Sequence, residues 1–221
     1  MARARATTPA AAAYADAVLP AGRDDWRAAR WAVVDLETTG LDPASDEIIA
    51  IAIVPIDGGR AQPGRAFYSL VRPASPPPPA SVRIHGIRPS DLEAAPALDA
   101  ILDDVLAALS GRLVVAHAAF VEQGFLEPVL ATRGVRLRGE VADTRRLGRV
   151  WLADRDPGTK APLMQLGALA ELLGLPVHRE HHALGDALTT AQVFLALASH
   201  LEHRGGLSVK TLVALQKGRH Q

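Results

Sequence analysis

Carboxylates at three distant places in this chain adjoin apolar segments, and they limit the folds that the chain can adopt. Asp35 and Glu37 end the run W-A-V-V-D-L-E, Glu122 follows the apolar segment L-V-V-A-H, and Asp186 lies near the start of a long amphipathic segment. A carboxylate beside a buried strand is costly to leave unpaired. Like charges also repel unless something positive lies between them. We therefore expect a fold that gathers these four side chains around bound cations.

The spacing within each segment supports this expectation. Side chains alternate along a strand, so Asp35 and Glu37 project from the same face. His181 lies five residues before Asp186, on a loop, where its ring is free to accept a proton from water near neutral pH. Each feature alone is more often structural, because a D-x-E pair is usually two solvated carboxylates and a histidine before a helix is usually a cap. Their combination indicates a nuclease site.

The composition excludes several classes of site. The chain has 221 residues, 48% of them hydrophobic, which is enough for one buried core. It contains no cysteine, which excludes disulfides and thiolate sites and favours a hard cation such as Mg²⁺ or Mn²⁺. Lys+Arg and Asp+Glu both total 24, which predicts local contacts with nucleic acid rather than tight binding to long duplexes. No apolar stretch is long enough to cross a bilayer, and we expect a cytoplasmic protein with no membrane partner.

Periodicity and turn residues predict three segments: a loose N-terminal segment (1–25) with a helical turn near 10–18, one catalytic domain (26–205), and a short C-terminal helix or tail (206–221). The proline-rich stretch 73–81 is expected to be an extended surface loop. Apolar patterns predict strands at 31–37, 47–57, 67–71, 113–117 and near 141, and helices at 97–109, 120–133, 145–152, 163–173, 183–202 and 209–216. This order predicts an α/β fold in which helices flank a mixed sheet.

Two of the acidic segments resemble motifs of a known family. V-D-L-E-T-T-G, which contains Asp35 and Glu37, and H-H-A-L-G-D-A, which contains Asp186, resemble the first and third motifs of the DnaQ-like DEDDh 3′–5′ exonucleases. That family includes the proofreading epsilon subunit of bacterial DNA polymerase III. The similarity extends from about Trp31 to His200. It implies a ribonuclease H-like fold, in which an antiparallel meander continues into parallel strands.

The resemblance also implies a mechanism. Two divalent cations, Mg²⁺ or Mn²⁺, would clamp the terminal phosphodiester, with Asp35 bridging them and His181, rather than His182, taking a proton from the attacking water. Nucleoside 5′-monophosphates would be released from the 3′ ends of single-stranded or frayed DNA. The implied metal ligands are Asp35, Glu37, Glu122 and Asp186. The implied contacts to the terminal nucleotide are Thr38, Thr39, Gly40, Leu41 and, from I-H-G-I, His85 and Ile87.

The second motif departs from the family pattern H-N-A-x-F-D-x-x-F-L. This chain has H-A-A-F-V-E-Q-G-F-L, so that Ala118 replaces asparagine, Val121 replaces phenylalanine and Glu122 replaces aspartate. A glutamate that acts on a metal through water can absorb its extra methylene, whereas direct ligation requires its helix to retreat. In V-A-D-T, Asp143 lies where the family often has a supporting acid, and a helix cap is an equally good interpretation.

Three functions fit these motifs. A DNA exonuclease is favoured, an RNA exonuclease resembling ribonuclease T or oligoribonuclease is the first alternative, and a weakly active nucleic-acid-binding module is the second. A proofreading role would require a polymerase or another replication or repair partner in trans, and the sequence leaves a homodimer open. The C-terminal helix expected at 209–216 would serve for packing or for docking.

Overall fold

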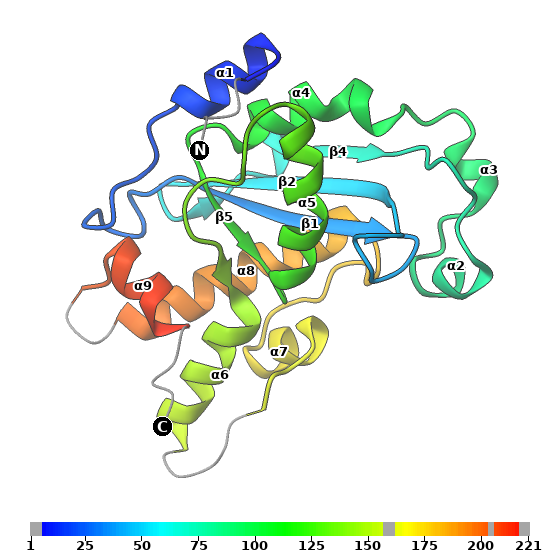
Figure 1. Cartoon of the computed structure of the whole chain (residues 1–221). Coiled ribbons are helices and arrows are strands. Elements are labelled where there is room, and N and C mark those ends of the chain that lie inside the picture. Colours follow the sequence, from blue (N-terminus) through cyan, green and yellow to red (C-terminus); the bar gives the residue numbers. More distant parts are fainter. Residues whose placement is uncertain (1–5, 157–161, 203–205, 217–221) are drawn as a thin grey trace.

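The computed structural model describes residues 6–156, 162–202 and 206–216. In this part of the chain a mixed six-stranded sheet has helices on both faces (Figure 1). The strands are β1 (Trp31–Thr38), β2 (Ile48–Asp57), β3 (Arg60–Ala61), β4 (Phe67–Leu70), β5 (Leu113–Ala116) and β6 (Ala142–Asp143). The helices are α1 (Pro9–Asp16), the 3₁₀ turn η1 (Pro63–Arg65), α2 (Pro79–His85), α3 (Pro89–Leu92), α4 (Leu98–Leu109), α5 (Phe120–Thr132), α6 (Thr144–Arg155), α7 (Leu166–Leu172), α8 (Ala183–Glu202) and α9 (Val209–Leu215).

The sheet combines antiparallel and parallel pairing, as the order of the elements predicts. β1 pairs antiparallel with β2, which in turn pairs antiparallel with β3 and β4. On its other side β1 pairs parallel with β5, and β5 pairs parallel with β6. The register of β1 and β2 shifts between Glu37 and Thr38, at the end of the strand that carries the first acidic motif. The predicted mixed sheet is therefore confirmed.

Strand alternation divides the core into two layers. Trp31 and Val33 belong to the apolar cluster that α8 shares with α6, α7 and α9. Ala32 and Val34 belong to the cluster that the sheet shares with α1, α4 and α5. The ring of Trp31 lies 4.9 Å from that of Phe194 in α8, measured between centroids. Because odd-numbered side chains of β1 face α8, the two acidic residues that follow on this strand face α8 as well.

The proline-rich stretch 73–81 is not a loop throughout, because a helix begins within it. Pro79 occupies the first turn of α2, which continues to His85. Proline is tolerated at this position because the first amide of a helix has no intrahelical partner and the fixed backbone angle of proline suits the helix. The expectation of an extended loop over 73–81 is therefore wrong for its last three residues, 79–81.

The N-terminal segment, expected to be loose, contains a packed helix. Thr8 caps α1 by accepting a hydrogen bond from the amide of Ala11 at 3.1 Å, and its hydroxyl donates to Asp103 in α4 at 2.9 Å. Tyr14 is buried, and its hydroxyl accepts from the amide of Arg138 at 3.1 Å. Burial of one tyrosine and one alanine on α4 stabilises a helix that is too short to persist alone.

The C-terminal helix belongs to the same core. The side-chain amide of Gln216, just after α9, donates to the carbonyl of Val141 at 2.6 Å, and its oxygen accepts from the amide of Asp143 at 2.5 Å. α9 therefore serves for packing, one of the two roles expected for it. The division at residue 205 and the last residues, 217–221, lie outside the described ranges, and the three-segment division stays a prediction. No helix in the described ranges is long and apolar enough to cross a membrane.

Substitution Gln216→Ala should destabilise the fold. It removes two buried hydrogen bonds and leaves a buried amide and a buried carbonyl without partners, so we expect the free energy of unfolding to fall by about 1–3 kcal/mol. Denaturant unfolding followed by circular dichroism measures this change. Lys210→Ala, an exposed position at the start of α9, is the matched control. Equal stability of Gln216→Ala and the wild type would show that these two hydrogen bonds do not contribute to folding.

Candidate active site

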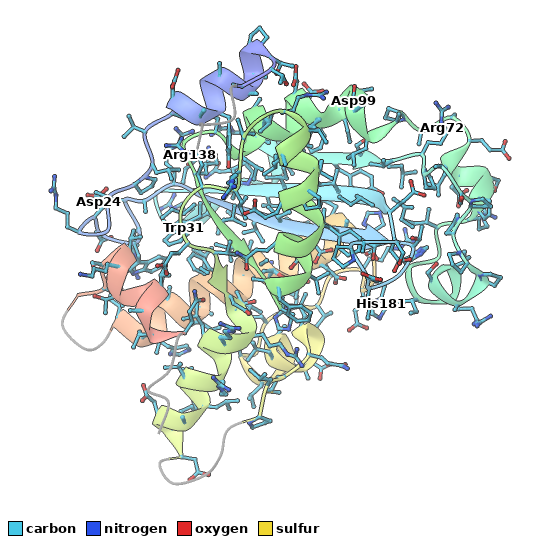
Figure 2. The ribbon with its side chains drawn as sticks, viewed as in Figure 1. Asp24, Trp31, Arg72, Asp99, Arg138 and His181 are labelled. Atoms are coloured by element: carbon cyan, nitrogen blue, oxygen red, sulfur yellow. The ribbon has the colours of Figure 1, made fainter. Side chains whose placement is uncertain are left out.

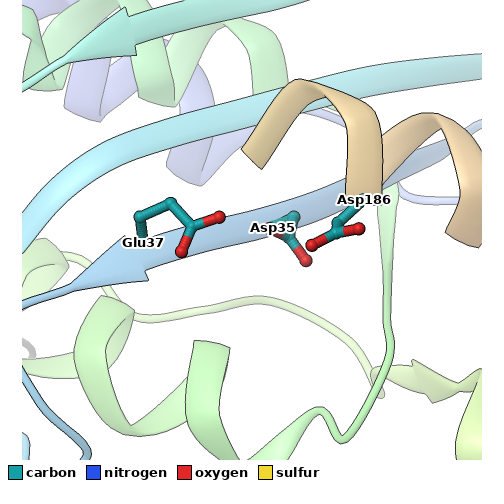
Figure 3. A group of neighbouring side chains, drawn as sticks. All are labelled: Asp35, Glu37 and Asp186. Atoms are coloured by element: carbon teal, nitrogen blue, oxygen red, sulfur yellow. The ribbon is translucent and has the colours of Figure 1, made fainter. Parts of the chain in front are cut away.

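Three carboxylates from two elements meet at the end of β1. Asp35 and Glu37 project from β1, and Asp186 comes from the first turn of α8 (Figure 3). One ligand oxygen from each of these side chains lies within 4.8 Å of the others. The packing of β1 on α8 thus brings together the first and third acidic motifs, as the sequence predicts.

Glu122 joins this group from the opposite layer. It lies in the first turn of α5, and its side chain is buried, with 5% exposed. Its Oε2 is buried without a hydrogen-bond partner. The charge of Glu122 helps to raise the pKa of Asp35, so the two carboxyls lie near each other, although Glu122 is outside the 4.8 Å group.

Burial and mutual repulsion make this cluster unfavourable when all its carboxyls are ionised. Burial, and then the charges of Glu122, Asp186 and Glu37, raise the pKa of Asp35 well above its ordinary value. Burial, and then Asp186, raise the pKa of Glu37 to about 8. Burial also raises the pKa of Glu122 to about 8 and raises that of Asp186. A cation among these oxygens would relieve the repulsion.

His181 lies beside the acidic cluster, on the loop before α8 and on the side of α2 (Figure 2). Its backbone amide donates to Oδ2 of Asp186 at 2.9 Å, and its φ is 55°, in the left-handed region. Its imidazole is exposed. The next histidine, His182, stacks on the ring of Tyr68 instead, with 5.2 Å between centroids. His181 is therefore the histidine whose ring is exposed beside Asp186, whereas the ring of His182 contacts Tyr68.

Gly185, which sequence reasoning missed, lets the His181 loop approach α8. A β-carbon at Gly185 would lie 2.2 Å from the carbonyl oxygen of Arg179. The same loop is held by the amide of His178, which donates to Oγ1 of Thr189 at 3.1 Å. The sequence did contain a signal for this close approach. Gly185 lies inside a helical pattern, one residue before a proposed metal ligand, and a glycine in such a position often allows another segment to pack closely against the helix.

The loop after β1, expected to contact the terminal nucleotide, is held by side-chain hydrogen bonds. The hydroxyl of Thr38 donates to the carbonyl of Gly40 at 2.5 Å, and that of Thr39 donates to Asp46 at 3.0 Å. A β-carbon at Gly40 would lie 2.4 Å from the Asp46 carboxylate, so a glycine is needed there. Leu41 projects into solvent, with 82% of its surface exposed. An apolar side chain is thus available beside the cluster.

The two residues expected from I-H-G-I have different surroundings. His85 ends α2 with its ring buried, and its Nδ1 accepts a hydrogen bond from the amide of Ile87 at 3.0 Å. Its Nε2 is buried without a partner, and the charge of His181 helps to lower its pKa, after burial. Ile87 packs into the apolar core on the α8 side of the sheet. The structure thus brings His85 near the site and buries Ile87.

A second network holds the start of α5, and sequence reasoning missed most of it. Burial lowers the pKa of His117 to about 4, so that its ring is neutral. His117 donates from Nε2 to the carbonyl of Met164 at 3.2 Å, and its Nδ1 lies 3.0 Å from the hydroxyl of Thr144. Asp143 caps α6, as one interpretation predicts, and also accepts from the amide of Ala118 at 3.2 Å. These contacts position the helix that carries Glu122.

Comparison with known proteins identifies the family. A family model described as exonuclease matches residues 32–194, which include every residue of the acidic cluster. The chain belongs to the DnaQ-like exonuclease family.

Individual relatives agree with this assignment. The protein is 30% identical over 201 residues to the DNA polymerase III subunit epsilon of Aquifex aeolicus, covering 89% of this chain and 95% of that protein. It is 36% identical over 176 residues to a DNA polymerase III subunit epsilon-like protein of Rhodobacter capsulatus, covering 78% of this chain and 24% of that protein. The solved structure of Exonuclease X in complex with 5′ overhanging duplex DNA matches with a TM-score of 0.62 and 24% identity, covering 84% of this chain and 99% of that one. This match confirms the predicted ribonuclease H-like fold.

The cluster of this exonuclease-family protein fits a hard divalent cation. Its donors are carboxylate oxygens, which Mg²⁺ and similar ions prefer. One of them, Oε2 of Glu122, is buried without any hydrogen-bond partner, and an ion or its water would satisfy it. Asp35, Glu37 and Asp186 would hold such an ion directly.

The metal-free protein should lose stability as the pH rises. Glu37 has a pKa of about 8 when folded and an ordinary value of 4.5, so the folded state binds more protons between these pH values. The free energy of unfolding should therefore fall from about pH 4.5 to pH 8, and Glu122 should act in the same direction. Thermal unfolding in EDTA across this range measures the slope, and Mg²⁺ or Mn²⁺ should reverse the loss at pH 8. Glu37→Gln should have a shallower slope, and a metal-free stability that rises with pH would contradict this account.

Proposed function

We propose that this protein is a metal-dependent 3′–5′ exonuclease that releases nucleoside 5′-monophosphates from single-stranded or frayed DNA ends. The meeting of Asp35, Glu37 and Asp186 within 4.8 Å carries the proposal, because bound cations relieve the repulsion within a cluster that is so buried and so acidic. His181, beside Asp186, supplies the group that such a hydrolysis needs in addition.

The proposed metal ligands have two roles, which follow from their positions. Asp35, Glu37 and Asp186 would hold divalent cations, two ions of Mg²⁺ or Mn²⁺, and Glu122 would support the second through a water molecule. The position of Glu122 outside the 4.8 Å group supports this indirect role. Bound cations of this kind lower the pKa of water and stabilise the charge that develops on a phosphodiester.

His181 would accept the proton of the attacking water. Its hydrogen bond to Asp186 uses the backbone amide, so the imidazole is left to turn toward the phosphodiester. An exposed imidazole can pass the proton on to solvent near neutral pH. The backbone of Thr38 to Leu41 and the ring of His85 would hold the terminal nucleotide, with the Leu41 side chain against its sugar and base.

The relatives support DNA as the substrate. The two similar proteins carry the name of a DNA polymerase III subunit, and the matching Exonuclease X structure contains DNA. A polymerase acting in trans is the partner that these names suggest. The neutral net charge suits strand ends, which need fewer phosphate contacts than a long duplex.

Digestion of matched DNA and RNA single strands tests the proposal. Strands labelled at the 5′ end, incubated with Mg²⁺ or Mn²⁺, should shorten one nucleotide at a time, with DNA shortened faster. EDTA and the variant Asp35→Ala should both abolish the reaction. Faster shortening of RNA would make the protein a ribonuclease, and binding without shortening in either metal would make it a binding module.

His181→Ala should separate proton transfer from metal binding. We expect kcat at neutral pH to fall by about 10²–10⁴, while Mn²⁺ affinity measured by calorimetry stays unchanged. His182→Ala, the neighbouring imidazole stacked on Tyr68, is the matched control and should keep most of its turnover. A fully active His181→Ala protein would remove this residue as the base.

Glu122 should act through its charge rather than its length. Glu122→Gln should lose roughly 10–100-fold in turnover, as is typical when an outer partner of a metal site is removed. Glu122→Asp keeps the charge and should lose less. Single-turnover rates at saturating Mn²⁺ compare the two variants. If Glu122→Gln is as active as the wild type, the carboxylate has no part in holding a cation, whereas a gain in Glu122→Asp would show that the longer side chain limits the native enzyme.

A further inference from the structure

A pocket of about 560 Å³ opens beside the acidic cluster. Its volume lies within the range of about 300–1,000 Å³ that is usual for ligand sites. Asp186 and His181 form one part of its wall, and the loop after β1 contributes Leu41. The pocket extends from there to the starts of α5, α6 and α7, which contribute Ala118, Arg145 and Gln165. It therefore begins at the proposed site of hydrolysis and continues beyond it.

Arg145 provides the positive charge in this pocket. Among the described residues that line it, Arg145 is the one arginine or lysine, and the same lining includes two carboxylates, Glu180 and Asp186. Its Nε is buried and has no hydrogen-bond partner. Its backbone is held by the Asp143 cap, whose carboxylate accepts from the Arg145 amide at 2.9 Å. A buried guanidinium nitrogen without a partner, on a fixed helix start, calls for an anionic ligand.

The short side chain of Ala118 leaves space in the pocket. The residue has a φ of 62°, a conformation that favours glycine or asparagine over alanine. The asparagine typical of the family at this position would project a longer side chain from the same wall of the pocket. The chain thus keeps a strained alanine where a better-suited residue would fill space next to Arg145.

We propose that this pocket receives the nucleotide next to the terminal one, and that Arg145 pairs with a non-scissile phosphate of the strand. The inference rests on the proposed exonuclease function. A strand whose last phosphodiester lies at the carboxylate cluster continues into this pocket past Glu180, a carboxylate that is not a proposed metal ligand and that repels the strand backbone. The guanidinium of Arg145, which lines the same pocket, offsets this repulsion and sets the path of the strand. Arg145 is thus a substrate-binding residue that fixes the register of the 3′ end.

A neutral phosphate analogue tests this contact directly. The substrate is a short DNA strand with a methylphosphonate at the phosphate adjoining the scissile one, compared with the unmodified strand. The modification should raise the KM of the wild type about 10–100-fold, the value of one charge-assisted hydrogen-bonded contact, with kcat little changed. Arg145→Ala should show the same rise on the unmodified strand and no further rise on the modified one. Arg145→Lys should keep part of the sensitivity.

Two controls separate this contact from folding and from general charge. Arg60→Ala removes an equal charge at the first residue of the edge strand β3 and should leave KM unchanged. The p-nitrophenyl ester of thymidine 5′-monophosphate has a single phosphodiester, so Arg145→Ala should hydrolyse it at the wild-type rate.

The outcomes distinguish this inference from the proposed function. If the wild-type protein hydrolyses neither the strand nor the ester, the proposed function is wrong. In that case, fluorescence anisotropy measures the affinity of the protein for the modified and the unmodified labelled strand. This comparison needs no turnover and still tests the role of Arg145. Equal affinity or KM of the wild type for the modified and unmodified strands would overturn the inference, as would an unchanged KM in Arg145→Ala.

Discussion

The packing of β1 against α8 is the interaction on which the site depends. The rings of Trp31 and Phe194, 4.9 Å apart, lie in the core layer between these two elements. Strand alternation then directs Asp35 and Glu37 toward the helix that carries Asp186. Apolar packing thereby forces together carboxylates that repel one another, and the energy for this comes from the core rather than from the site. Such preorganisation leaves the cluster ready for cations.

The hydrogen bonds of Asp143 connect the remaining parts of the site. It caps α6, accepts from the amide of Ala118 before α5, and donates its own backbone amide to Gln216 beyond α9. The start of the helix that carries Glu122, the start of the helix that carries Arg145 and the C-terminal helix therefore meet at one residue. The family often has a supporting acid at this position, and in this chain it supports by hydrogen bonds to the backbone.

Local patterns were sufficient for much of the architecture. The helix predicted at 183–202 has the bounds of α8, and β1 extends one residue beyond the predicted strand 31–37. Those elements have long apolar periodicity and clear turn residues at their ends. The predictions that were wrong concern residues whose environment is set by contacts with distant parts of the chain. The N-terminal segment, expected to be loose, contains an ordered helix because α1 packs on α4 and buries Ala11 and Tyr14.

The sequence by itself determined which chemistry is available: a cysteine-free chain with four carboxylates and one imidazole in recognisable spacing can hold hard cations and little else. Only the tertiary structure decided how these groups are used. It stacks His182 on Tyr68 while holding the backbone of His181 on Asp186, and it places Glu122 outside the group formed by Asp35, Glu37 and Asp186. The physical reason is that residue type and short spacing fix charge and local direction, whereas burial and distance arise from contacts between segments more than a hundred residues apart, such as Asp35 and Asp186.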